Sequence, residues 1–599
     1  MLALLVAACS GDSAGGGAQA SGPRPAPGFE VYKHNGGVPR PANAVDIYLV
    51  YGPETEEYMP ELIRRFNQAY ADGKNPVSGQ PLAQGEKPIY VWGTDPVTGS
   101  SGTVAQGIVN ALIAPNNANV YKPTIFQPSV GHWLGWVNYN ANRTVFNLSD
   151  APGTALSPVV IGIWEERLNQ LMAATGKDRR DIGWADLLAV LDDGWPQGRR
   201  AVYYGHADPR HSSTGLSATI IEFYACARQN GFTDRRLTAE QVSDPNVQAC
   251  MREIQNLVRH YSRRTEDFLA YFGQGPDYLD MLALEETDLI CINLGAAQGD
   301  QTCLQPQGGR LLALYPAEGT FWHEHPFGIV QLDVSQGGWT TQEQRDAARV
   351  FTDFVLSAPS QEYIMTFGFR PANPNVALGY PFVEETGVLP EGPAVILDLP
   401  DYSTINAIQQ SWTLVKKQAD IILLIDTSGS MSDDGKIDQA REAALRFVEA
   451  LESGSRVGLT TFSDAVQTRV TMGGLENVRE QLTSHIKSLR ASGGTELYLA
   501  LRTVVEQLNS EQDSDRVRAV VLLSDGADTG SSGVTLNDAL QAISASRDSL
   551  NPVIVVPLAY GADADVTTLN AIAQASRTRV QSGDPSSIGA LLQLISSFF

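Results

Sequence analysis

Five side chains that can bind a metal through oxygen stand on three polar loops near the C-terminus: Asp426, Ser428, Ser430, Thr495 and Asp525. The first loop follows the apolar run 421–425, the second precedes a helical pattern, and the third follows the apolar run 519–523. Hard cations such as Mg²⁺ prefer oxygen ligands in a near-octahedral array that keeps waters or a partner's oxygen. The residue types therefore predict a divalent-cation site that serves binding rather than catalysis.

The elements around these loops are predicted to bring them together. Apolar runs typical of buried strands alternate with amphipathic helical patterns, which indicates an α/β sheet. The predicted strands are 421–425, 456–462, 519–524 and 552–557, and the predicted helices are 438–452, 475–489, 497–508 and 588–598. Ligands of open α/β sheets bind at the carboxyl ends of strands, where all three loops are expected. The alternative is that Asp-Thr-Ser-Gly-Ser is an ordinary helix-capping loop.

This arrangement resembles the von Willebrand factor A-type domain with its metal-ion-dependent adhesion site, over residues 417–599. All five oxygen-bearing residues match the motif position by position. The resemblance implies a doubly wound, Rossmann-like fold and a bound Mg²⁺ or Mn²⁺. It also implies that the hydroxyls coordinate directly, that the carboxylates often act through water, and that an Asp or Glu of a protein partner completes the metal shell.

Length and charge limit what the rest of the chain can do. The chain has 599 residues, of which 43% are apolar and 18% charged, so several cores can be buried and we expect three lobes. The net charge of −24 and the lack of a Lys/Arg cluster argue against nucleic acid as a partner. The acidity itself is explained by solubility.

The N-terminal residues indicate export. An apolar stretch runs into Val6-Ala-Ala-Cys9, followed by a Gly/Ser-rich and then a Pro-rich segment. This resembles a bacterial lipoprotein signal over residues 1–9, with Cys9 lipidated and residues 10–43 as a tether. We therefore expect a cell-envelope protein, lipid-anchored on the outer face of the plasma membrane or in the periplasm. No Lys or Arg precedes the apolar run, so the true start is expected upstream; the alternative is a chance apolar start.

The remaining four cysteines fall into two local pairs. Cys226 with Cys250 and Cys291 with Cys303 are typical of two disulfides in an exported protein, although the sequence alone allows three connectivities. A zinc site is the rival interpretation. It is disfavoured because there is no Cys-x-x-Cys pair and no His at ligand spacing from a Cys.

A long region, residues 44–388, precedes the metal-site domain. Its strand and helix patterns alternate, with strands at 45–50 and 88–92. The polar loop 99–103 leads into a helix over 104–112, and a similar polar turn, 206–215, leads into a helix over 216–226. The free N–H groups and the dipole at a helix start favour an anionic or polar ligand.

Taken together, these stretches resemble the extracellular solute-binding proteins of ABC importers, in the two-lobed periplasmic type II class. The resemblance implies crossing strands at 157–163 and 311–330, a first lobe of residues 44–155 plus 315–388, and a second lobe of residues 156–314. A small polar or anionic solute is expected in a cleft lined by Thr55, Ser100, Ser129, Ser213, Thr214, Tyr315 and Trp322. Each Ser or Thr is equally an ordinary helix cap.

Three other groups have structural interpretations. His323 and His325 share a strand face without a third ligand nearby, so we expect a structural role. Residues 206–212 contain His, Asp and Ser but lack the Gly-x-Ser-x-Gly elbow of hydrolases. Arg370 could bind a ligand carboxylate or form a salt bridge.

The hypothesis is therefore a non-enzymatic, lipid-anchored binding protein of α/β class. It combines a solute-binding-like module with an adhesion-type domain, joined by a linker over 389–416 that carries a short helix. Membrane contact is expected through the lipid anchor only. The alternatives are the receptor of an ABC importer and, more remotely, an exported hydrolase that uses His211 and Ser212.

Overall fold

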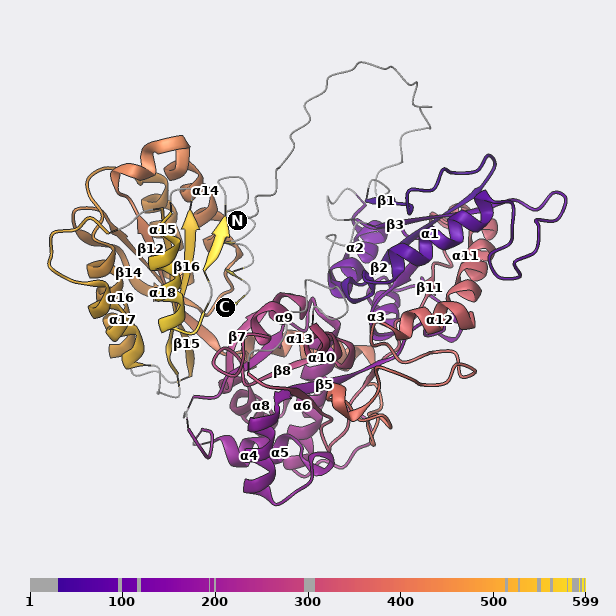
Figure 1. Ribbon diagram of the computed structural model, residues 1–599, viewed down its shortest axis with the longest axis horizontal. Helices are drawn as coiled ribbons and strands as arrows, with labels where there is room; N and C mark the ends of the chain where they lie inside the picture. Colours follow the sequence, from indigo (N-terminus) through magenta and orange to yellow (C-terminus); the bar gives the residue numbers. More distant parts are fainter. Residues whose placement is uncertain are drawn as a thin grey trace, which may run out of the picture.

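The computed structural model describes residues 31–599 except 95–99, 116–119, 193, 199–200, 296–307, 512–514, 526–527, 547–550, 561–563, 579, 584–591, 593–594 and 597. Cys9 and Cys303 therefore lie outside the described residues, as does most of the helix expected over 588–598. Three α/β lobes are visible, with the C-terminal one set against the middle one (Figure 1). Each lobe has one sheet.

Lobe one contains the sheet β1-β3-β2-β4-β11. Its strands are β1 (Tyr32–His34), β2 (Val45–Tyr51), β3 (Ile89–Thr94), β4 (Ile125–Gln127) and β11 (Gly328–Ile329). Its helices are α1 (Met59–Ala71), α2 (Ser101–Ile113), α3 (His132–Asn140), α11 (Gln342–Val355) and α12 (Ala358–Met365), with a short 3-10 turn η1 (Pro53–Thr55). Strand β2 is parallel to β3 and β4, so the loops after these strands emerge at one edge.

Lobe two contains the sheet β10-β5-β8-β6-β7, with β9 also paired to β5. Its strands are β5 (Ser157–Trp164), β6 (Tyr204–Ala207), β7 (Val258–Ser262), β8 (Met281–Glu285), β9 (Leu311–Leu314) and β10 (Trp322–His323). Its helices are α4 (Glu165–Thr175), α5 (Trp184–Leu191), α6 (Ser213–Gln229), α7 (Ala239–Ser243), α8 (Pro245–Asn256), α9 (Glu266–Phe272) and α10 (Glu286–Leu294). Cys226 and Cys250 join α6 to α8 through a disulfide.

The chain passes between these lobes near Ser157 and again between β10 and β11. Strand β10 belongs to the sheet of lobe two, whereas β11 pairs with β4 in lobe one. The lobe boundaries differ from the expectation in two respects. Tyr315 and β10 were expected in lobe one but belong to lobe two, because Tyr315 lies in its apolar cluster and β10 pairs with β5. Phe382, Val388 and Leu389 are buried in an apolar cluster of lobe two rather than lobe one. Arg370 holds the end of this segment, because it donates to the carbonyls of Leu389 and Pro390, each at 2.6 Å.

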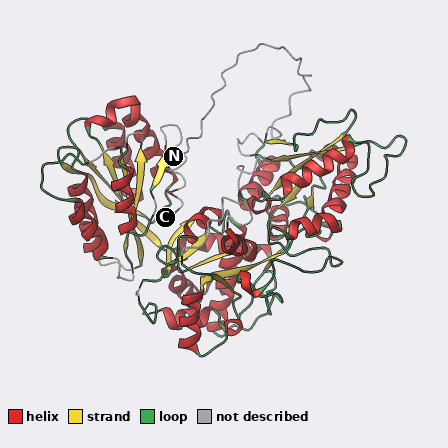
Figure 2. Ribbon diagram, in the orientation of Figure 1, coloured by secondary structure: helices red, strands yellow, loops and turns green. Residues whose placement is uncertain are grey.

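The C-terminal domain is a mostly parallel sheet in the order β14-β13-β12-β15-β16-β17. Its strands are β12 (Gln418–Asp426), β13 (Arg456–Phe462), β14 (Val466–Gly474), β15 (Arg516–Ser524), β16 (Val553–Tyr560) and β17 (Gln581–Gly583). Its helices are α14 (Lys436–Ala450), α15 (Leu475–Ser488), α16 (Leu497–Ser510), α17 (Leu536–Ala545) and α18 (Val566–Ala575). Helices lie on both faces of the sheet (Figure 2).

Alternation along β12 explains this two-sided burial. Ile421, Leu423 and Ile425 pack in the cluster that contains α14 and α15, whereas Ile422 and Leu424 pack in the cluster that contains α16, α17 and α18. Because successive side chains point to opposite faces, a strand covered on both sides has to be apolar throughout. The sequence did not indicate β14, an antiparallel edge strand in which only Val470 is buried.

Helix α13 (Tyr402–Val415) joins the modules and is packed rather than free. Trp412 stacks on His206 of lobe two, with ring centroids 5.2 Å apart. In lobe one, Trp136 Nε1 donates to Asn406 Oδ1 at 2.8 Å. The C-terminal domain also contacts lobe two, because Arg259 Nη2 donates to the carbonyl of Ser576 at 2.7 Å. None of the helices in the described part is long and apolar enough to cross a membrane.

Candidate functional site

The structure brings the first and third oxygen-bearing loops together at the carboxyl edge of the C-terminal sheet. Asp426 is the last residue of β12, and Asp525 follows directly after β15. These strands are parallel neighbours with Ile425 opposite Leu523, so they end side by side. The adjacency of the two carboxylates follows from strand pairing.

A chain of short contacts connects four of the five predicted residues. The Ser428 N–H donates to Asp426 Oδ1 at 2.8 Å, and the hydroxyls of Ser428 and Ser430 lie 3.1 Å apart. Ser430 Oγ donates to Asp525 Oδ1 at 2.8 Å, and Ser524 Oγ donates to Asp426 Oδ2 at 2.8 Å. Two carboxylates and two serine hydroxyls are thus held within hydrogen-bond reach of one another.

The loop that carries Thr495 is attached to the first loop through its backbone. The Gly429 N–H donates to the Gly493 carbonyl at 2.9 Å. Asp464 Oδ1 accepts from the Gly494 N–H at 2.7 Å. Gly493 has φ +84°, and a Cβ there would lie 2.1 Å from Asp464 Oδ2, so only glycine fits this turn. Thr495 is 5% exposed and lies at the same edge of the sheet.

Burial sets the electrostatics of the two carboxylates. Asp426 is fully buried, and desolvation raises its pKa to about 6 against the opposing effect of its hydrogen bonds from Ser428 and Ser524. Asp525 has a cationic partner, because Lys436 Nζ lies 2.7 Å from Asp525 Oδ2 and the lysine side chain is 4% exposed. Among the described ion pairs Asp426 has no cationic partner, so the two carboxyl groups share one lysine.

The donor set fits a hard divalent cation because it consists of carboxylate and hydroxyl oxygens only. Within the described ranges, no group of three or more His, Cys, Asp or Glu side chains could hold a metal, so a site here depends on the serine and threonine hydroxyls. Sequence reasoning missed Lys436. Its position at the first residue of α14, ten residues after Asp426, is the signal that could have identified it.

The predicted cleft residues are buried between lobes one and two, where several act as local hydrogen-bond partners. Thr55 Oγ1 donates to the Gly52 carbonyl at 2.9 Å, and Ser100 Oγ lies 3.3 Å from Thr103 Oγ1. Ser129 Oγ lies 3.4 Å from Ser101 Oγ. Ser213 Oγ accepts from Trp133 Nε1 at 3.0 Å, whereas Thr214 Oγ1 is buried and has no hydrogen-bond partner among the described residues.

The two aromatic residues predicted for the cleft wall lie beside Glu286 and Arg370, and their role in a cleft stays a prediction. The Tyr315 hydroxyl donates to Glu286. Arg370 donates to the same carboxylate, from Nε at 2.7 Å and Nη2 at 2.9 Å. Trp322 lies beside Arg370, whose guanidinium carbon is 5.8 Å from its ring centroid. Arg370 is therefore held in a buried ion pair, the structural one of the two roles considered for it.

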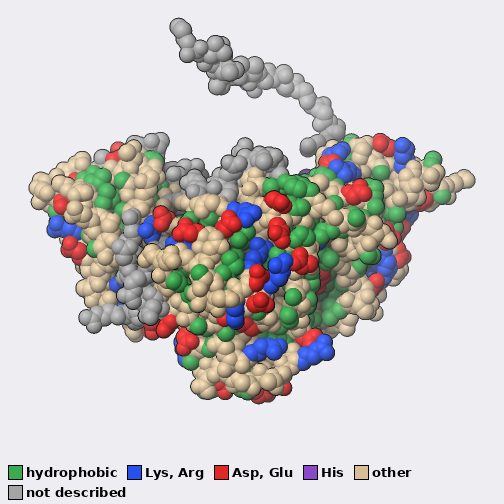
Figure 3. All heavy atoms as spheres, turned by 60° about the horizontal axis from the view of Figure 1, so that its bottom comes forward, with side chains coloured by type: hydrophobic (Ala, Val, Ile, Leu, Met, Phe, Trp, Pro, Cys, Tyr) green, Lys and Arg blue, Asp and Glu red, His purple; other side chains and the backbone are tan. Residues whose placement is uncertain are grey.

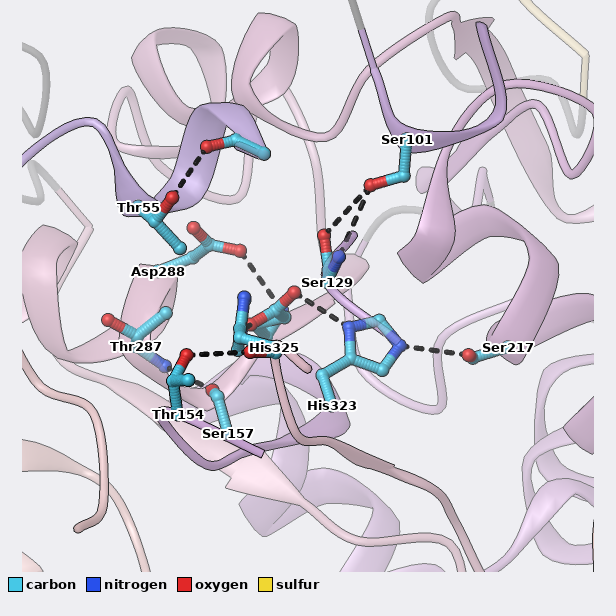
Figure 4. A network of polar contacts seen from close by, with 12 residues as sticks. Thr55, Ser101, Ser129, Thr154, Ser157, Ser217, Thr287, Asp288, His323 and His325 are labelled. Atoms are coloured by element: carbon cyan, nitrogen blue, oxygen red, sulfur yellow. Dashed lines mark hydrogen bonds and ion pairs between the residues drawn. The ribbon is translucent and has the colours of Figure 1, made fainter. Parts of the chain in front are cut away.

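His323 and His325 both bind Glu285, a residue that sequence reasoning missed. His323 Nδ1 lies 2.7 Å from Glu285 Oε1, and His325 Nε2 lies 3.1 Å from Glu285 Oε2. Burial acts to raise the pKa of Glu285, but the two imidazoles outweigh it and lower that pKa to about 2. Ser217 Oγ contacts His323 Nε2 at 2.8 Å, and Figure 4 shows this network between side chains of both lobes.

The segment 206–212 does not assemble a hydrolytic triad from its described side chains. Arg210 Nε donates to Asp208 Oδ1 at 3.0 Å, which fixes the turn. His211 Nδ1 contacts Thr103 Oγ1 at 3.4 Å, and Ser212 Oγ accepts from the Gly215 N–H at 3.1 Å. The histidine and the serine thus have different partners, whereas a nucleophile needs its base within hydrogen-bond reach.

Known proteins match this chain mainly over its C-terminal domain. A family model of the von Willebrand factor type A domain matches residues 420–593. Calcium-activated chloride channel regulator 1 of Bos taurus is 32% identical over 124 residues, which are 20% of this chain and 14% of that protein. Inter-alpha-trypsin inhibitor heavy chain H4 of Sus scrofa is 35% identical over 124 residues, which are 20% of this chain and 13% of that protein.

One relative matches a longer stretch. An uncharacterized protein of Mycobacterium tuberculosis is 24% identical over 282 residues, which are 44% of this chain and 39% of that protein. That share exceeds residues 420–593, so the similarity extends beyond the C-terminal domain. The chain thus spans 39% or less of each of these relatives.

Among solved structures, a von Willebrand factor type A protein from Catenulispora acidiphila has 20% identity and a TM-score of 0.27, covering 30% of this chain and 42% of its own. BatB from Bacteroides thetaiotaomicron has 18% identity and a TM-score of 0.25, covering 30% of this chain and 98% of its own. With the family-model match and the α/β sheet described above, residues 420–593 form a von Willebrand factor type A domain.

Proposed function

We propose that this domain binds a divalent cation, Mg²⁺ or Mn²⁺, and captures a protein partner through it. Asp426, Ser428, Ser430, Thr495 and Asp525 are the proposed ligands, and an Asp or Glu of the partner completes the metal shell. The observation that supports this most is the contact chain from Asp426 through the two serine hydroxyls to Asp525 at the open edge of the sheet. The matched family supports a role in metal-dependent protein interaction.

The bound cation would supply a positive charge that attracts a carboxylate. Other residues of this chain hold the proposed ligand oxygens and the loops beside them in place. Ser524 holds Asp426, and Asp464 fixes the glycine turn that carries the loop of Thr495. Glu496 Oε1 accepts from the N–H groups of Ser531 and Ser532, at 2.6 and 3.0 Å, and so ties down a further loop beside the site.

Capture of a partner from an envelope extract tests the proposal. The intact chain is incubated with extract in Mg²⁺ or in chelator, and the captured proteins are identified by mass spectrometry. A partner captured only with Mg²⁺, and lost in Asp426→Ala, is expected. The exposed Glu253→Gln is the matched control. Capture that persists in chelator contradicts the proposal, and unchanged melting of the Asp426→Ala chain rules out unfolding as the cause.

For residues 44–388 we propose a periplasmic type II solute-binding-like module, exported and anchored through Cys9. The supporting observation is the pair of sheets joined by two chain crossings, with a polar network between them. The receptor of an ABC importer is the second candidate, and it predicts uptake of a bound solute through a permease. A non-enzymatic role is proposed throughout, because His211 and Ser212 contact different partners.

The charge of the chain favours a protein over nucleic acid as the partner. The chain carries a net charge of −24. On the face drawn in Figure 3, Lys and Arg side chains are interspersed with Asp and Glu. A phosphate backbone requires a continuous basic surface, which this face does not offer.

A further inference from the structure

Acidic side chains from both lobes meet where lobe one contacts lobe two; Glu285 and Asp288 are buried, whereas Glu54 and Glu266 are half-buried. Glu54 lies on η1 of lobe one, whereas Glu266 and Asp288 lie on α9 and α10 of lobe two. Glu285, at the end of β8, is the fourth carboxylate of the group, and it interacts electrostatically with Glu54 and Asp288. Figure 4 shows Asp288 near Thr55 of lobe one and beside the histidine network. The group therefore spans the boundary between the lobes.

Basic side chains of the protein contact one member of this group and leave three without such a contact among the described ion pairs. Glu285 is held by the two imidazoles described above. Arg264 interacts electrostatically with Glu54 and Glu266. Its ion pair, however, is with Asp267, because Arg264 Nη2 donates to Asp267 Oδ1 at 2.8 Å. Among the described ion pairs, Glu54, Glu266 and Asp288 have no cationic partner within 4.0 Å. Burying carboxylates without a cation is costly.

Two of these carboxylates also have oxygens with nothing to accept from. Glu54 Oε2 and Glu266 Oε2 are inaccessible to solvent and have no hydrogen-bond partner among the described residues. The same is true of Thr214 Oγ1, which lies one turn of α6 before Ser217 of the histidine network. Most buried polar atoms in native proteins are paired, so three orphaned oxygens near one boundary indicate a missing donor.

The titration behaviour of the three carboxyls agrees with this. Burial, then the fields of Glu285 and Asp288, raises the pKa of Glu54 to about 8. Burial and the field of Glu54 raise the pKa of Glu266 well above its usual range, and burial with the fields of Glu285 and Glu266 does the same for Asp288. Each group would be stabilised in its charged form by a positive ligand.

At each of the two helix starts that favoured an anion in the sequence, one N–H group already has a protein acceptor. The Gly102 N–H at the start of α2 donates to the His211 carbonyl at 2.9 Å. The Gly215 N–H at the start of α6 donates to Ser212 Oγ at 3.1 Å. An anion at this boundary would therefore have fewer free N–H donors than the sequence suggested, and it would lie near three carboxyl groups without a cation.

We infer that the boundary between lobes one and two is a binding site for a small organic cation with several N–H donors, a primary ammonium or a guanidinium, held by Glu54, Glu266 and Asp288. This inference rests on the proposed solute-binding role of residues 44–388 and gives its ligand a chemical class. A bare metal ion fits less well, because the described acidic side chains are not arranged as a metal site. An ammonium or guanidinium directs separate donors to oxygens of both lobes.

Thermal shift and calorimetry on the full chain test this inference. The probes are 1,4-diaminobutane and arginine, with tetramethylammonium as a cation without N–H donors and glutarate as an anion, all at equal ionic strength. We expect either or both N–H cations to raise the Tm, with no shift from tetramethylammonium or glutarate. Glu54→Gln and Glu266→Gln should each weaken binding by about tenfold or more, because a hydrogen bond to a charged group is lost. Glu253→Gln, an exposed change on α8, should leave binding unchanged.

The outcomes separate this inference from the proposed function. A shift from glutarate alone overturns the cation site but keeps a working solute-binding module. The cation site is also overturned if tetramethylammonium raises the Tm as much as the N–H cations do, because charge screening alone then explains the shift. Binding that is unchanged in the double variant Glu54→Gln/Glu266→Gln overturns it in the same way. No shift from either N–H cation also overturns it. If native mass spectrometry then finds no small molecule on the purified chain, the solute-binding role itself is refuted.

Discussion

Replacing Lys436 by Met should strengthen Mg²⁺ binding and weaken the metal-free fold. The lysine ammonium lies 2.7 Å from Asp525 Oδ2, and both side chains are buried. At an effective dielectric constant of about 20, two unit charges at this distance interact by about 6 kcal/mol, and removing one partner of a buried pair costs about 3–5 kcal/mol. A cation bound at Asp525 has to compete with that ammonium.

Without the ammonium, the buried Asp525 keeps its hydrogen bond from Ser430 but has no cationic partner among the described residues. We therefore expect Lys436→Met to lower the free energy of unfolding by about 3 kcal/mol in the absence of metal. If Mg²⁺ recovers that energy, its Kd falls by about 100-fold. Isothermal titration calorimetry gives the Kd, and melting with and without Mg²⁺ gives the stability.

Two further variants make this result interpretable. Lys487→Met removes an exposed lysine of α15 in the same domain and should change neither quantity. Lys436→Gln keeps a polar group if the Met variant folds poorly. A Kd for Mg²⁺ that is unchanged or higher in the Lys436 variants refutes the competition, as does a stability loss that Mg²⁺ does not recover.

Three other changes probe the lobes and their contacts. Glu285→Gln should lower the free energy of unfolding by about 3 kcal/mol, because His323 and His325 lose their shared anion; chemical denaturation measures this, and a loss under about 1 kcal/mol contradicts it. Arg259→Ala removes donors to the C-terminal domain, so calorimetry should resolve a separate transition, whereas an unchanged single transition argues against a stabilising contact. The raised pKa of Glu54, about 8 against an ordinary 4.5, means that the folded chain holds a proton that the unfolded chain releases. The free energy of unfolding should therefore fall as the pH rises from about 5 to 8, by at most about 5 kcal/mol, and Glu54→Gln should flatten that slope; an equal slope in the variant refutes the assignment.

The positions of the residues proposed to bind the metal could be predicted from the sequence because these residues sit at fixed places in local elements. Asp426 ends an apolar run that is buried on both faces, and the serines follow at a spacing that one tight loop can turn. The α14 to α16 helices were expected within a few residues of their observed bounds, because their apolar periodicity is strong. Such features depend on neighbours in the chain.

The contacts that the sequence did not reveal depend on neighbours in space. Glu285 meets His323 and His325 across 38 and 40 residues, and nothing local marks it as their partner. Tyr315 was expected in a cleft, yet it points to Glu286 in the interior. Polar residues near a lobe boundary can face the ligand or the core, and only the packing of both lobes decides between them.

The loop that carries Arg210 and His211 contacts all three lobes. The carbonyl of His211 accepts from the Gly102 N–H at the start of α2 in lobe one, at 2.9 Å. The neighbouring Arg210 pairs with Glu452, just beyond α14 of the C-terminal domain. Glu452 also lies 3.5 Å from Lys416 Nζ, at the end of α13. A movement of lobe one relative to lobe two therefore has to break these contacts or carry them along. The loop thus connects the boundary where we propose ligand binding with the end of the helix that begins at Lys436.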